Sequence, residues 1–65
     1  MTSEQSRDIY FEHIMIGSSV KVIAIDSLTA IEVSIVGPAS AAKSDLERVA
    51  LRKLLVRIAR EQPDR

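Results

Sequence analysis

The shortness of the chain is the feature that most restricts its fold. It has 65 residues, which is enough for one hydrophobic core. It contains no cysteine and therefore forms no disulfide, and its single histidine, His13, is too few for a zinc site. A domain of this size buries too little apolar surface to be stable without help, and partner subunits are the remaining help. The sequence therefore predicts a single domain over residues 1–65 that needs no cofactor or metal and assembles with copies of itself.

The composition is typical of a protein that folds in water. Apolar residues make up 46% of the chain and charged residues 28%, as in globular domains rather than disordered tails. The longest apolar runs, such as Ile14–Ile16 and Val22–Ile25, are far shorter than a bilayer span, and the polar start lacks the apolar stretch of a secretory signal. We therefore expect a cytoplasmic protein that does not bind membranes.

Three runs rich in Ile, Val and aromatic residues predict three short strands. Gly17-Ser18-Ser19 offers a tight turn after the first run, and Asp26-Ser27-Leu28-Thr29 offers a second turn whose polar side chains can bond the backbone. Such short connections predict an antiparallel meander over residues 8–37, which follows a polar tail at 1–7. The expected strands are 9–16, 20–25 and 30–36.

A long helical pattern follows the meander. Gly37-Pro38 ends the third run, and Ser44 with Glu47 three residues later matches the capping box that begins many helices. Good helix formers follow, so we predict a helix over 44–61 and a polar tail at 62–65. The predicted fold class is α+β, with a three-stranded antiparallel β-meander followed by one C-terminal amphipathic α-helix (βββα).

The predicted helix has an apolar side and a basic side. The apolar stripe, which we expect to pack on the sheet, consists of Ala50, Leu51, Leu54, Leu55 and Ile58. The opposite side carries Arg48, Arg52, Lys53, Arg57 and Arg60. Val49 and Val56 lie seven residues apart among these cations, which indicates a second and weaker contact surface.

The strand pattern gives the strongest indication of a partner. Side chains alternate between the two faces of a strand, and all three runs place apolar residues on both faces of the predicted sheet. One helix covers only one face, so apolar surface remains for an interaction, unless a monomer covers these residues by itself. We predict a non-enzymatic interaction or structural domain that forms a homo-oligomer, most simply a two-fold dimer joined by faces or edges. Its expected anchors are Phe11, Ile14, Val33 and Ile35.

The basic side of the helix supports a second hypothesis. The chain has no net charge, but residues 38–65 hold seven of its nine basic residues, and a basic helix face can neutralise phosphates. Few aromatic residues accompany these charges, and a solvated helix face explains them equally well. The candidates for binding an anion or nucleic acid are Arg48, Arg52, Lys53, Arg57 and Arg60.

His13 is the one candidate for acid–base catalysis, since only its side chain titrates near neutrality without perturbation. Glu12 is its neighbour, but adjacent strand residues point to opposite faces, so the two side chains cannot cooperate in a regular strand. We expect no converging pair of carboxylates and assign no catalytic residue. An enzyme whose site forms around His13 between subunits is the third hypothesis.

Four segments carry a resemblance to a known family. They are Tyr10-Phe11-Glu12, Val20-Lys21-Val22, the stretch E-V-S-I-V-G-P-A-S at 32–40, and Ala50-Leu51-Arg52-Lys53-Leu54. In this order they resemble a family of small uncharacterised alphaproteobacterial proteins, a domain of unknown function. The resemblance implies a bacterial source and supplies no activity, cofactor or site residue.

Overall fold

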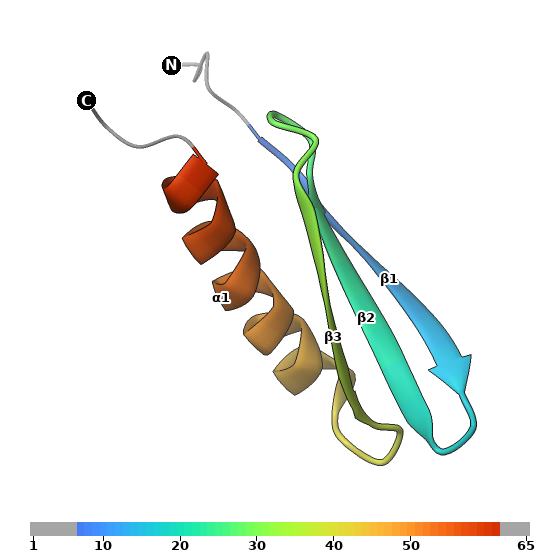
Figure 1. Ribbon diagram of the computed structural model, residues 1–65. Helices are drawn as coiled ribbons and strands as arrows, with labels where there is room; N and C mark the ends of the chain where they lie inside the picture. Colours follow the sequence, from blue (N-terminus) through green and yellow to red (C-terminus); the bar gives the residue numbers. More distant parts are fainter. Residues whose placement is uncertain (1–6, 62–65) are drawn as a thin grey trace.

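The computed structural model describes residues 7–61 as a three-stranded sheet and one helix, so the predicted βββα fold is confirmed (Figure 1). β2 is the central strand and pairs antiparallel with both neighbours. The expected tail residues 1–6 and 62–65 lie outside the described part of the chain. The elements are β1 (Ile9–Ile16), β2 (Ser19–Asp26), β3 (Glu32–Pro38) and α1 (Lys43–Glu61).

A two-residue turn joins β1 to β2. Ile16 pairs with Ser19, which leaves Gly17 and Ser18 as the loop and makes Ser19 the first residue of β2. Gly17 has a φ of 61°, the positive φ that a type II′ turn needs at its first central position and that glycine adopts without strain. The turn fixes the register of β1 on β2, and the register decides which side chains share a face.

Asp26 organises the turn between β2 and β3. Its Oδ2 atom accepts hydrogen bonds from the Thr29 backbone nitrogen at 3.1 Å and from the Thr29 hydroxyl at 2.7 Å. Arg7 is predicted to belong to the N-terminal polar tail. Its Nε atom lies 2.9 Å from Oδ1 of Asp26. These partners allow a carboxylate to be fully buried at the end of a strand. The predicted role of Asp26 in the turn is confirmed.

The third strand lies two residues later than predicted. Ala30 has a φ of 65°, so the turn continues through it and β3 begins at Glu32 rather than at residue 30. At the other end, Pro38 pairs with Ser19 as the last residue of β3, a position at which a strand tolerates proline. The shift leaves the alternation of side chains along β3 unchanged.

α1 packs along one face of the sheet, over β2 and β3, and leaves β1 farthest from it (Figure 1). The contact is made by a line of helix residues four positions apart, which lie one above another on the helix. An added β carbon on Gly37 would lie 2.6 Å from Cδ2 of Leu46, so the glycine permits α1 to approach β3 closely. The buried core consists of Val20, Val22, Ala24, Val33, Leu46, Ala50, Leu54 and Ile58.

Two features of the helix differ from the predictions. Leu55, predicted in the apolar stripe, is 47% exposed, whereas Leu46, outside the predicted stripe, is buried, because the packed line follows every fourth residue from Leu46 to Ile58. The Ala42 carbonyl accepts a hydrogen bond from the Leu46 nitrogen at 3.2 Å, so Ala42 is the N-cap and the helix begins before Ser44. The capping box predicted at Ser44 is therefore wrong.

Candidate functional site

The four predicted interface residues lie on two faces of the sheet. Phe11, Val33 and Ile35 belong to or pack against the core beneath α1, whereas Ile14 lies on the opposite face, here termed the open face. No helix or strand among residues 7–61 covers the open face. Its side chains include Tyr10, Glu12, Ile14, Ile16, Lys21, Ile23, Ile25, Glu32, Ser34 and Val36. The predicted set thus combines core residues with one surface residue.

β1 is the least covered strand of the sheet. α1 packs on β2 and β3, and the outer edge of β1 pairs with no other strand of the described chain. Tyr10, Ile14 and Ile16 are exposed on the open face, and Met15 is 63% exposed on the face that carries α1. β1 therefore presents apolar side chains on both faces together with a free backbone edge.

The hydrogen-bond pattern identifies the backbone groups that β1 leaves unpaired. Along an antiparallel strand, one residue directs its N–H and C=O groups toward the strand on one side, and the next residue directs these groups toward the opposite side. The Asp8 carbonyl accepts a hydrogen bond from the Ser27 nitrogen at 2.9 Å, so the even-numbered residues of β1 bond toward β2. Phe11, His13 and Met15 therefore direct their N–H and C=O groups outward.

The other edge of the sheet, formed by β3, is protected. Lys53 of α1 donates from Nζ to the Ser34 carbonyl oxygen at 2.8 Å, so a charged side chain occupies this edge. Pro38, at the end of β3, has no N–H to offer a further strand. Lysine and proline are both residues by which edge strands avoid pairing, and β1 contains neither. The two edges of the sheet therefore differ in their capacity to bind another strand.

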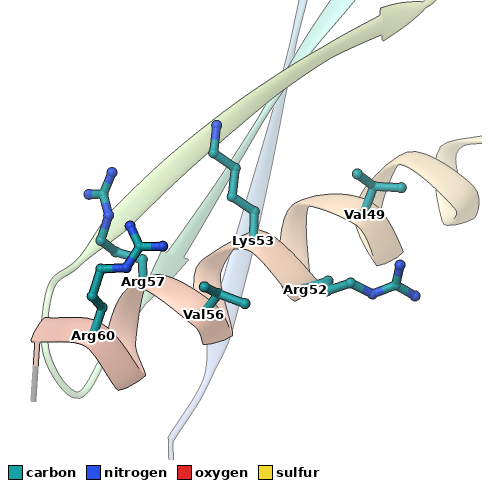
Figure 2. Close-up of a pocket in the computed structure, with 6 residues that line it drawn as sticks. All are labelled: Val49, Arg52, Lys53, Val56, Arg57 and Arg60. Carbon is teal, nitrogen blue, oxygen red and sulfur yellow. The ribbon is translucent and has the colours of Figure 1, made fainter. Parts of the chain in front are cut away.

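A groove of about 410 Å³, here termed the basic groove, runs along the side of α1 that lies next to β3 (Figure 2). It is lined by Val49, Arg52, Lys53, Val56, Arg57 and Arg60. Figure 2 shows Lys53 and Arg57 rising from α1 toward β3, while Arg52 extends away from that strand. Arg48 does not line the groove, and its Nη1 atom lies 3.4 Å from Oδ1 of Asp45. Four of the five predicted basic residues thus share one groove with both predicted valines.

His13 contacts a residue that the sequence does not indicate. Its Nε2 atom lies 3.1 Å from Oε2 of Glu47 in α1, and both side chains are partly covered. Glu12, its neighbour in sequence, lies on the open face, as the alternation of side chains predicts. The sequence carries no signal for the contact between residues 13 and 47, because it depends on where α1 lies over the sheet. The pair links β1 to α1.

Comparison with protein families places the chain in one of them. A family model described as a domain of unknown function (DUF6898) matches residues 6–61, a range that includes all four elements. The chain belongs to the DUF6898 family. No curated protein and no solved structure matches this DUF6898 domain. The predicted membership in a family of unknown function is confirmed, and the alphaproteobacterial source stays a prediction.

The two candidate surfaces of the DUF6898 domain lie on opposite sides of α1. Glu47 contacts His13 of β1 on one side of the helix, and Lys53 contacts Ser34 of β3 on the other. The edge of β1 and the basic groove are therefore separate surfaces of the domain. Within residues 7–61 of the domain, no helix is both long and apolar enough to cross a lipid bilayer.

Proposed function

We propose that this DUF6898 domain is a non-enzymatic interaction module that forms a two-fold homodimer through β1. The contrast between the two sheet edges carries the proposal, since β3 is protected by Lys53 and Pro38 while β1 is not. An unprotected apolar edge strand is a template for pairing with another strand. A second copy offers the same strand, and two identical edges can pair antiparallel about a two-fold axis.

Pairing of two β1 strands would provide stabilisation that a small domain otherwise lacks. The outward N–H and C=O groups of Phe11, His13 and Met15 would gain partners in the second copy. The exposed side chains of Tyr10 and Ile14 would gain cross-strand neighbours, which are the unit of sheet stabilisation. The association is thus supported by both the backbone and the side chains of the strand.

The proposal gives His13 a structural role. Its Nε2 atom faces Glu47 of α1 at 3.1 Å, so the imidazole joins the edge strand to the helix. A strand held by this contact presents a defined edge to a partner. Less conformational entropy is then lost when the partner binds. The contact is therefore the basis on which we assign His13 a structural role in the dimer.

The proposal is tested by light scattering over a concentration series, in which we expect the wild-type chain to be a dimer. Met15→Pro removes one outward N–H without taking a bond from β2, so we expect a monomer whose circular dichroism is unchanged. Met15→Ala keeps the N–H and shortens the side chain, and as the matched control it is expected to remain dimeric.

A second pair of variants covers the case in which Met15→Pro does not fold. Met15→Lys places a charge on the edge of β1, and Leu28→Lys places the same charge in the β2–β3 turn, at a residue that is 55% exposed. Only the first is expected to weaken the dimer. A wild-type chain that is monomeric at every concentration, or a dimer that resists both Met15→Pro and Met15→Lys, contradicts the proposal.

A further inference from the structure

The basic groove combines positive charge with exposed apolar surface. Its lining contains three guanidinium groups and one ammonium group, and no carboxylate of the described residues lines it. The Lys53 ammonium is already bonded to the Ser34 carbonyl, so Arg52, Arg57 and Arg60 are the groups that face a ligand. Several cations in one groove attract negative charge more strongly than a lone surface residue does. The groove is therefore suited to an anionic partner.

Val49 and Val56 distinguish between kinds of anionic partner. Their side chains are 49% and 52% exposed. Because the two valines are two helical turns apart, they lie on the same side of α1, and both line the groove. A phosphate backbone would neutralise the arginines but leave both valines in contact with water. A protein segment with carboxylate and apolar side chains would satisfy both kinds of lining residue.

The positions of the aromatic residues also disfavour single-stranded nucleic acid. Proteins that bind such strands stack successive bases on aromatic side chains. Tyr10 and Phe11, the only tyrosine and phenylalanine of the chain, belong to β1. The groove lies on the β3 side of α1, where Lys53 reaches Ser34, so neither ring lines it.

We infer that the basic groove docks an acidic amphipathic segment of another protein. The groove extends from Val49 to Arg60, which at the rise of an α-helix is about 16 Å along α1. The valines are seven residues apart, the spacing at which a partner helix with one apolar residue per heptad would meet both. Glutamate or aspartate side chains beside that apolar line would reach the arginines, with bidentate contacts to their guanidinium groups.

Fluorescence anisotropy with labelled probes tests the inference. The first probe is a peptide of about two heptads with leucine once per heptad and glutamate at the flanking positions. The comparison probes are a glutamate peptide of equal charge without leucine and a short DNA duplex. We expect the amphipathic peptide to bind about ten-fold more tightly than the glutamate peptide, because only it covers the valines. Its affinity is expected to fall as salt is added.

Three variants separate the contributions to binding. Val49→Thr with Val56→Thr keeps the branched shape but replaces a methyl group by a hydroxyl at each site, and it is expected to reduce the affinity for the amphipathic peptide to that for the glutamate peptide. Arg52→Glu with Arg60→Glu is expected to abolish binding of both peptides. Arg48→Glu changes a basic residue of the same helix outside the groove and is expected to leave binding unchanged.

Several outcomes would overturn the inference. Tighter binding of the DNA duplex than of the amphipathic peptide would favour nucleic acid, and equal binding of the two peptides would remove the role of the valines. Absence of binding by the amphipathic peptide, or undiminished binding by the double arginine variant, would count equally against it. The same titration with the Met15→Pro chain keeps this result separate from dimerisation, because the groove lies across α1 from β1 and is expected to bind equally well in a monomer.

Discussion

The hydroxyl of Thr29 donates to Oδ2 of Asp26 at 2.7 Å and accepts a hydrogen bond from the Ile31 nitrogen at 3.2 Å. One side chain thus ties the end of β2 to the residue before β3. We expect Thr29→Val, which removes the hydroxyl and keeps the shape, to lower the free energy of unfolding by about 1 kcal/mol in urea titrations. Thr29→Ser keeps the hydroxyl and serves as the control; an equal loss in both variants would contradict the role of the hydrogen bonds.

The same carboxylate makes stability depend on pH. The hydrogen bond from the Thr29 hydroxyl is the largest cause, and with the Thr29 N–H and the Arg7 guanidinium it lowers the pKa of Asp26 below its usual 3.8 despite the opposing effect of burial. The Asp26 carboxyl therefore binds a proton more readily in the unfolded chain than in the folded chain at acidic pH. For this reason the free energy of unfolding rises as the pH rises from the lowered pKa to 3.8. The contribution is present above pH 3.8 and is lost as the pH falls through the lower folded pKa.

Urea titrations at a series of acidic pH values measure this contribution. Asp26→Asn removes the titrating group and is expected to have a lower unfolding midpoint at neutral pH and a flatter pH dependence below pH 3.8. If wild type and Asp26→Asn lost stability in parallel on acidification, the acid sensitivity would belong to other carboxylates.

Ala30 adopts a conformation that favours glycine. Its φ of 65° places its β carbon close to its own backbone, a strain of about 1 kcal/mol that glycine avoids. We expect Ala30→Gly to raise the thermal unfolding midpoint, although glycine usually destabilises a folded chain. Ala59→Gly, at an exposed position in α1, is the matched control and is expected to lower stability by about 1 kcal/mol. A decrease in both variants would show that Ala30 is not strained.

Adjacent leucines in α1 are expected to respond differently to truncation. Leu54 is fully buried against the sheet, so Leu54→Ala should reduce the free energy of unfolding by about 3 kcal/mol, since it leaves a cavity. Leu55 is 47% exposed, and Leu55→Ala should cost less than about 1 kcal/mol. Similar losses from the two truncations would mean that α1 is rotated from the position described above.

The fold was predictable because its signals are local. The apolar runs and the turn at Gly17 give the order and direction of the strands, and β1 has the predicted bounds. The position of α1 on the sheet is not local. Two neighbouring stripes of the helix are apolar, and only packing against β2 and β3 selects the line through Leu46 and excludes Leu55.

The candidate surfaces were predictable in part for the same reason. Alternation places Phe11 and Ile14 on opposite faces of β1, but both faces are apolar, so the sequence does not show which face the helix covers. The spacing of Val49 and Val56 among basic residues did indicate a second contact surface, because the helix period alone brings them together. The protection of β3 by Lys53 depends on a contact between distant residues and has no signature in the sequence.

The difference between the two edges limits how far copies of the domain could assemble. A unit with two reactive ends grows into a chain, whereas a unit with one reactive end can only form a pair. β3 is blocked by Lys53 and Pro38, so each domain brings a single reactive end, at β1. In the proposed dimer both reactive ends are used by the pairing of the two β1 strands, so we expect the assembly to stop at two copies rather than to grow into fibrils.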